Sequence, residues 1–216
     1  MAFGRRTSES HPAQKPSPRS GPAVQAGTPC GSLARVLARV LREPKPEILN
    51  LGPLCGDSVV YLAGRGAKVY VEDFDPPPPT PPRSPGEILV ERIPIRFDCP
   101  DSAIHLVLTW ELADFVPPDR LSDLGAELRR VTREGGFVLM FSHARPEKTI
   151  EPMARYRLLA DDLIVREPCG HLPPRPRWVH PNREIERALA GFSIQGIHLQ
   201  RSQMREILAL RAGVGA

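Results

Sequence analysis

The chain has 216 residues, of which 41% are hydrophobic and 25% are charged, values close to those of ordinary globular proteins. This length favours one domain with a tail over two full domains, and a net charge of +4 is too small by itself to identify a nucleic-acid-binding protein. No apolar run approaches the length that crosses a bilayer, so we expect no membrane partner.

The cysteines indicate the cellular compartment. They are far apart in the sequence, without the close pairs that bind zinc and without the dense framework of secreted domains. They are Cys30, Cys55, Cys99 and Cys169. This usage is typical of a reducing environment, so we expect a cytoplasmic protein with no metal site.

The N-terminal segment is rich in Pro, Ser, Gly and Arg and has few large apolar residues, which predicts a disordered tail over residues 1–31. Ser32 is a candidate N-cap, because apolar residues at helical spacing follow it until Pro44. These apolar residues are Leu33, Val36, Leu37, Val40 and Leu41. We therefore place the folded domain at residues 32–216.

A βαβ unit is predicted next. The apolar run at residues 48–52 ends in a glycine-bounded turn and predicts a buried strand, and a helix is expected over residues 57–63. The β-branched segment at residues 68–72 then predicts a second strand, parallel to the first and joined to it by a right-handed crossover.

The middle of the chain departs from the usual doubly wound pattern. Prolines crowd residues 76–85, where the second crossover helix is expected, so this helix should be missing or short. Beyond the prolines, the pattern predicts strands at residues 88–93 and 104–110, a helix over residues 119–131 and a fifth strand at residues 137–142.

The C-terminal part predicts a helix at residues 182–190 and then an antiparallel hairpin, with strands at residues 192–199 and 204–211. A Pro- and Arg-rich insert at about residues 143–181 is positioned to cap the crevice of the sheet. The fold class is therefore α/β: a doubly wound, mostly parallel seven-stranded sheet with a C-terminal antiparallel hairpin and a reduced second crossover helix.

The ligand crevice of such a sheet lies at the carboxyl ends of the strands, where the strand order reverses. The turn from Gly52 to Gly56 falls there, and glycines let an anionic group approach the backbone N–H groups of the following helix. An acid at the tip of the second strand can accept both hydroxyls of a ribose. Strand alternation favours Glu72 for this role, whereas the spacing from Gly52 favours Asp73, so both are candidates.

Four segments carry a resemblance to a known family: ILNLGPLCG, GAKVYVED, HLVLTWELADFV and LRRVTREGGFVLMFS. On these segments, residues 46–211 resemble class I S-adenosylmethionine-dependent methyltransferases. The segments LNLGPLCGDSV, VYVEDF, NREIERALAGF and MREIL are also similar to those of uncharacterised bacterial methyltransferase-like proteins. The resemblance implies a Rossmann-like methyltransferase fold with S-adenosylmethionine as cofactor.

The resemblance also implies which residues would contact the cofactor. The turn at its methionine end holds Asn50, Leu51, Gly52, Pro53 and Gly56. Glu72 or Asp73 would hold the ribose, Asp98 is a substitute for the acid near the adenine, and Trp110 and Glu111 would line the rim beside the sulfonium.

Several features depart from the family pattern. Asn50 takes the place of the usual acid, Leu54 that of a common second glycine, and no carboxylate lies close to Ile93 for the adenine amino group. His105, where Asp is frequent, is more typical of a structural residue within an apolar strand. Together with the proline tract, these departures motivate an alternative: a non-catalytic, methyltransferase-like binding or scaffold protein.

Methyl transfer needs an aligned nucleophile and exclusion of water more than it needs a covalent residue. The residues that could orient or deprotonate an acceptor are Glu111, Asp114, His143 and His180, each equally compatible with a packing role. We expect the acceptor to be a small molecule or a protein side chain. RNA ranks lower, because no RNA-binding module accompanies the basic tail and the insert arginines, which are Arg155, Arg157, Arg175 and Arg177.

Overall fold

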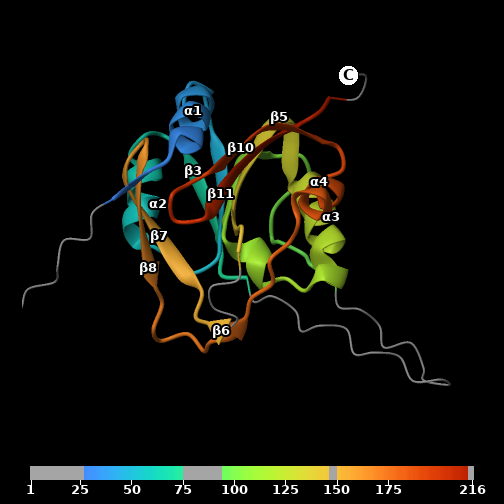
Figure 1. Ribbon diagram of the computed structural model, residues 1–216. Coiled ribbons are helices and arrows are strands. Elements are labelled where there is room, and N and C mark those ends of the chain that lie inside the picture. The colour runs from blue at the N-terminus through green and yellow to red at the C-terminus, as the bar shows by residue number, and fades with distance from the viewer. Residues whose placement is uncertain (1–26, 75–93, 146–149, 214–216) are drawn as a thin grey trace, which may run out of the picture.

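A six-stranded mixed sheet lies at the centre of the protein (Figure 1). The computed structural model describes residues 27–74, 94–145 and 150–213. The strands follow one another across the sheet in the order β10-β11-β5-β4-β2-β3. Their bounds are β2 (Glu47–Leu51), β3 (Lys68–Glu72), β4 (Ile104–Trp110), β5 (Thr132–His143), β10 (Phe192–Leu199) and β11 (Met204–Arg211).

The parallel core and the terminal hairpin agree with the prediction. Strand β3 pairs in parallel with β2, β2 with β4, and β4 with β5, so the chain order reverses between β2 and β4. Strands β10 and β11 form the antiparallel hairpin, and β11 lies antiparallel to β5. The proline tract at residues 76–85 and the expected strand at residues 88–93 lie outside the described residues, so the reduced crossover helix and the seventh strand stay predictions.

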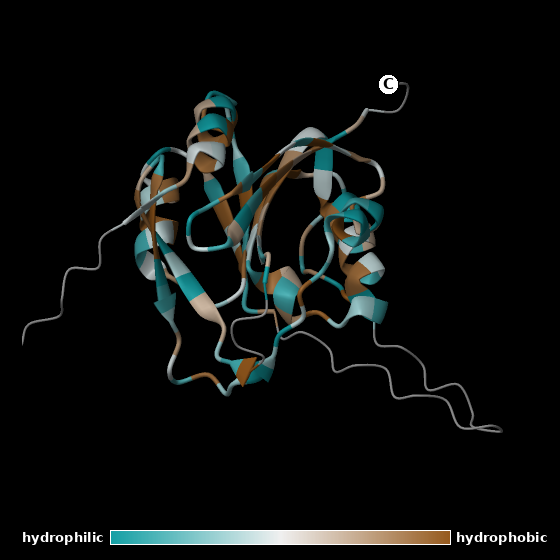
Figure 2. Cartoon of the chain, viewed as in Figure 1, coloured by the Kyte–Doolittle hydropathy of each residue, from teal (hydrophilic) through white to brown (hydrophobic). Residues whose placement is uncertain are grey.

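Helices cover both faces of the sheet. One face carries α1 (Gly31–Val40) and α2 (Gly56–Ala63), and the other carries α3 (Leu121–Val131) and α4 (Asn182–Ala188). Strand β4 is apolar on both faces because it lies between these layers: Leu106 belongs to the same apolar cluster as Leu37 of α1, and Val107 to that of Leu124 of α3. Figure 2 shows the apolar residues gathered on the inner surfaces of the helices and the sheet.

Helix α1 begins one residue before the predicted N-cap. Its first residue is Gly31 and its N-cap is Cys30, whereas Ser32 lies buried within the first turn. The carboxylate of Glu206 in β11 accepts hydrogen bonds from the Ser32 N–H and the Cys30 thiol, each at 3.3 Å. The Glu206 carboxylate, from the far end of the chain, therefore caps the helix in place of the Ser32 hydroxyl. Its negative charge also interacts favourably with the positive N-terminal end of the helix dipole.

The fold also begins before residue 32. Residues 28 and 29, which the sequence assigned to the disordered tail, form β1 (Thr28–Pro29) and pair antiparallel with β8 (Leu163–Pro168) of the insert. The N–H of Cys30 continues this pairing by donating to the carbonyl of Asp162 at 2.6 Å. The boundary at residue 31 was therefore placed a few residues too late, and residues 1–26 lie outside the described residues.

The insert forms sheets of its own. Its strands are β6 (Ile150–Glu151), β7 (Ala154–Ala160), β8 (Leu163–Pro168) and β9 (Arg175–Pro176). Strand β8 lies between β1 and β7, and β6 pairs with β9. Figure 1 shows β7 and β8 beside α2, where the Ser58 hydroxyl donates to the Tyr156 carbonyl at 2.8 Å and accepts from the Leu158 N–H at 3.0 Å. Within the described ranges, no helix is both long and apolar enough to span a membrane.

Candidate functional site

The glycine turn joins the carboxyl ends of β2 and β3. Gly52 follows β2 with a φ of 93°, a conformation that strains any residue with a Cβ. Its N–H donates to the carbonyl of Glu72 at 2.9 Å, so the turn is fixed to the tip of the neighbouring strand. Leu51 and Pro53 are buried beside it, and Gly56 begins α2 in an exposed position. The structure thus brings the predicted turn and the predicted acidic strand tip together.

The two candidate ribose ligands have different surroundings. Glu72 is half-buried, and its Oε1 accepts the N–H of Asp98 at 2.9 Å. The side chains of Asp73 and Asp98 are exposed. Asp98 therefore reaches the predicted site through its backbone, and the choice between Glu72 and Asp73 stays open.

Asn50 and Trp110 contact each other directly. Asn50 is 2% exposed, and its Oδ1 accepts the indole N–H of Trp110 at 2.8 Å, which ties the ends of β2 and β4 together. Trp110 ends β4 with a φ of 48°, and its ring stacks on that of Tyr156 with 4.8 Å between the centroids and 4° between the planes. The amide in place of the usual acid thus has an internal partner.

Glu111 is the most completely bonded acid of the site. It is 1% exposed, and its carboxylate accepts four hydrogen bonds, all from the insert. The donors are Ala154 N–H at 3.0 Å, Tyr156 Oη at 3.1 Å, Arg166 Nε at 2.8 Å and Arg166 Nη2 at 3.0 Å. Burial and the Glu111 carboxylate raise the pKa of Tyr156, so its hydroxyl stays protonated and donates.

Met153 lies over the glycine turn. Its side chain is 5% exposed, and its Cε is the nearest atom to the position that a Cβ of Gly52 would take, at 3.8 Å. It belongs to the same apolar cluster as Leu51 and Ala113. The insert therefore covers the carboxyl ends of β2 and β4.

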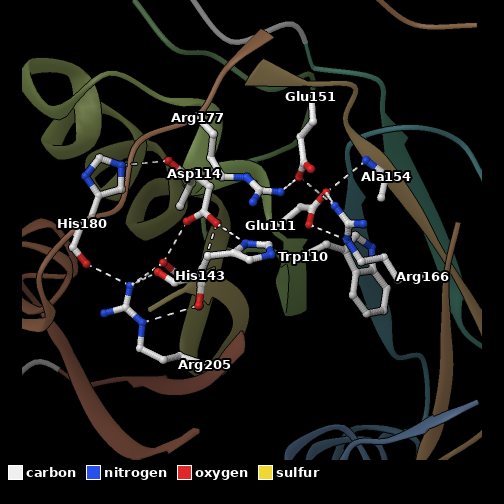
Figure 3. A network of polar contacts seen from close by, with 12 residues as sticks. Trp110, Glu111, Asp114, His143, Glu151, Ala154, Arg166, Arg177, His180 and Arg205 are labelled. Carbon is white, nitrogen blue, oxygen red and sulfur yellow. Dashed lines mark hydrogen bonds and ion pairs between the residues drawn. The ribbon is translucent and has the colours of Figure 1, made fainter. Parts of the chain in front are cut away.

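Asp114 and His143 form a buried pair at the ends of β4 and β5 (Figure 3). Asp114 is fully buried, and its Oδ2 accepts from the His143 Nδ1 at 2.7 Å and from the His143 N–H at 2.8 Å. Its Oδ1 accepts the Ser142 hydroxyl at 2.8 Å. Because a carboxylate oxygen accepts, Nδ1 donates in this bond, and in the neutral form of the ring the lone pair lies on Nε2.

Arg205 connects this pair to the insert. Its Nη2 donates to the Ser142 hydroxyl at 2.7 Å and to the carbonyls of His143 at 2.8 Å and His180 at 2.9 Å. Burial lowers the pKa of Arg205, and the Asp114 carboxylate acts against this shift. The four candidate catalytic residues therefore lie in one polar region, which Figure 3 shows from close by.

His180 takes part in this region through its backbone and one ring nitrogen. It is fully buried, and Nε2 donates to the carbonyls of Ala113 and Val116 at 3.0 and 3.1 Å, which fixes the 3-10 helix η1 (Leu112–Phe115). Its Nδ1 finds no hydrogen-bond partner among the described residues. These contacts indicate a structural role.

Sequence reasoning missed the partners in the insert. Arg166 and Met153 of the insert and Arg205 of β11 were not singled out. Three of the insert arginines that were singled out have internal partners. Arg155 and Arg157 both bind Glu167 at 2.9 Å. Arg177 forms an ion pair with Glu151. The sequence signal that could have found Arg166 was the buried Glu111, which needs a cation once its strand is placed in the core.

No protein-family model and no curated protein matches the chain in sequence. Among solved structures, it is similar to an S-adenosylmethionine-dependent methyltransferase from Clostridium acetobutylicum, with a TM-score of 0.53, 10% identity and 84% of this chain and 92% of that chain covered. It is also similar to one from Methanosarcina mazei, with a TM-score of 0.51, 14% identity and 82% and 97% coverage. The chain therefore has the α/β fold of class I S-adenosylmethionine-dependent methyltransferases, as its sequence motifs predicted.

Proposed function

We propose that the protein is an S-adenosylmethionine-dependent methyltransferase that acts on a small molecule or a protein side chain. The observation that carries this proposal is the joint placement of Gly52, in a conformation reserved for glycine, and of Glu72 and Asp73 at the tip of the adjacent strand. In a fold of this class, that edge of the sheet is where a nucleotide cofactor binds.

The residues around the turn fit the cofactor in part. The N–H groups at the N-terminal end of α2 would donate to the methionine carboxylate beside Leu51, Gly52, Pro53 and Gly56, and an acid at the β3 tip would accept hydrogen bonds from the ribose hydroxyls. Asp98 would bind the adenine amino group. Asn50, Trp110 and Glu111 would line the wall of the site toward the sulfonium.

When bound, S-adenosylmethionine supplies an electrophilic methyl group. We assign the removal of the acceptor's proton to Nε2 of His143, because Asp114 fixes the ring with its lone pair on that nitrogen. Asp114 is then a positioning residue, and its own contacts to Ser142 and the His143 N–H hold it in place. We assign Glu111 and His180 to holding the insert and η1, since their polar contacts lie within the chain.

A second candidate function is a non-catalytic, methyltransferase-like binding or scaffold protein. The observation that favours it is the use of Glu111 and Trp110, two predicted cofactor residues, as contacts for the insert. In that case the insert would occupy the crevice permanently, and no cofactor would bind there.

Calorimetry of the full chain with S-adenosylmethionine and S-adenosylhomocysteine tests the choice. The methyltransferase proposal predicts saturable heat with both ligands and a rise in the unfolding temperature. Glu72→Ala and Asp73→Ala should weaken binding unequally, the larger loss marking the ribose ligand. No heat and no thermal shift at millimolar ligand would favour the non-catalytic alternative.

A further inference from the structure

We infer that residues 150–168 form a lid, closed in this structure by the ion pair between Glu111 and Arg166, and that the cofactor binds only when this lid opens. The inference rests on the proposed function, because it concerns access to the same crevice. It adds a regulated step: the chain competes with its own cofactor for the site.

The first observation is the position of Met153. Its Cε lies 3.8 Å from the position that a Cβ of Gly52 would take, so the side chain occupies the space next to the turn that would receive the methionine end of the cofactor. Its burial with Leu51 shows that it fills the space and does not rest on the rim.

The second observation is how the insert contacts the wall of the crevice. Every donor to the Glu111 carboxylate comes from β7 or β8, and the Trp110 ring is covered by Tyr156. Arg166 also donates to Glu151 at 3.0 Å, which joins β8 to β6. Three predicted cofactor residues, Gly52, Trp110 and Glu111, are therefore contacted by one segment.

The third observation is that the strands of the insert pair separately from the central sheet, although Met153, Tyr156 and Leu158 pack in its apolar clusters. The sheet of the insert, β1-β8-β7, shares no strand pairing with the central sheet. One of its closing contacts is electrostatic, between an acid with a 1% exposed side chain and an arginine whose side chain is 31% exposed. Because the arginine is partly hydrated, water can solvate it when the insert opens.

The consequence for affinity follows from population shift. If only the open form binds, the observed dissociation constant is the intrinsic one divided by the fraction of open molecules. Any change that weakens closure, without touching the turn, must therefore tighten binding. If the insert did not block the cofactor site, the same changes would leave the affinity for the cofactor unaltered.

The experiment measures S-adenosylhomocysteine affinity by calorimetry on the full chain and on three variants. Arg166→Ala removes the arginine of the closing pair and leaves Glu111, which would line the cofactor wall, unchanged. Met153→Ala empties the space over Gly52. Arg157→Ala is the matched control, because its side chain is also 31% exposed and it pairs with Glu167 on the same hairpin.

The lid predicts that the dissociation constant falls by about tenfold or more in the first two variants and stays within about twofold of wild type in Arg157→Ala. Equal affinities in all four proteins would overturn the lid and leave the proposed function intact. Absence of binding in all four, including Met153→Ala, would overturn the proposed function and with it the lid.

Hydrogen exchange gives a second readout with an unusual sign. Saturation of the wild type with S-adenosylhomocysteine should speed the exchange of the Ala154 amide, because opening breaks its bond to Glu111. A ligand that bound beside a permanently closed insert would slow it. Slower exchange on binding would therefore contradict the lid.

Discussion

At the scale of single residues, the hydrogen bond between Asn50 and Trp110 links two strand ends that the fold needs at fixed positions. Both side chains are buried, and the bond is 2.8 Å long. A buried donor that loses its acceptor keeps the cost of its desolvation. The departure from the family's usual acid is therefore part of the stability of this chain.

Asn50→Leu should lower the free energy of unfolding by about 1–3 kcal/mol, because the indole N–H is left without an acceptor. Urea unfolding measures the loss. The double variant Asn50→Leu/Trp110→Phe removes donor and acceptor together, so its loss should be smaller than the sum of the two single losses. Additive losses would show that the bond contributes nothing to stability.

His105 should make stability depend on pH. Burial lowers its pKa below the ordinary value, and Arg133, 2.7 Å from Nε2, lowers it further. As pH falls through about 6.5, the unfolded chain takes up a proton that the folded one does not, so stability decreases toward acid. The free energy of unfolding, measured at several values between about pH 7 and pH 5, should therefore fall with pH.

Two variants test this assignment. His105→Gln removes the titrating group, and Arg133→Ala removes the repulsion and moves the pKa back toward its ordinary value. Both should make the dependence of stability on pH shallower than in wild type. If the dependence of stability on pH were unchanged in both variants, a group other than His105 would take up the proton.

At the scale of elements, helices α3 and α4 meet at one glycine. A Cβ at Gly125 would overlap the carbonyl of Ala188, with the carbonyl carbon only 2.6 Å away. The two helices pack this closely only because Gly125 has no side chain. This close packing explains why a glycine, which is otherwise unfavourable inside a helix, stands at this position.

Gly125→Ala should destabilise the protein by about 1–3 kcal/mol, because α3 must move away from α4 and the gain in helix propensity is smaller than this strain. Thermal unfolding followed by circular dichroism measures the change. Gly31→Ala is the matched control, since a Cβ there meets nothing within 4 Å. If both variants were equally stable, the close contact would not be a constraint.

The elements also show how far local sequence carries. The predicted bounds of β4, β10 and β11 coincide with those observed, because apolar and β-branched runs ended by polar turns are local signals. The start of α1 was missed because its cap is Glu206, 174 residues away. The turn at Gly52 and the acids at the β3 tip were found from spacing, whereas Met153 and Arg166 reach the site through docking of the insert, which spacing does not encode.

At the scale of the whole molecule, the chain divides into a central sheet with its helices and an insert with its own strands. The four cysteines are all free and buried, and they lie in both parts of the molecule. Cys30 packs in the cluster that α1, the sheet and insert residues such as Tyr156 share, whereas Cys169 follows β8 and belongs to neither apolar cluster. Burial raises the pKa of both thiols, so neither reacts readily in the closed molecule.

The rate of thiol labelling should therefore report which part opens first. Cys169 should label with iodoacetamide faster than Cys30 under native conditions, because opening of the insert costs less than global unfolding. Peptide mass spectrometry on the wild-type protein separates the two sites. Urea should speed the labelling of Cys30 with the steep dependence of global unfolding and that of Cys169 with a shallower one, because insert opening exposes less surface. Equal rates and equal urea dependence would mean that the insert and the sheet open as one cooperative unit, and the lid would then lack the independent motion it requires.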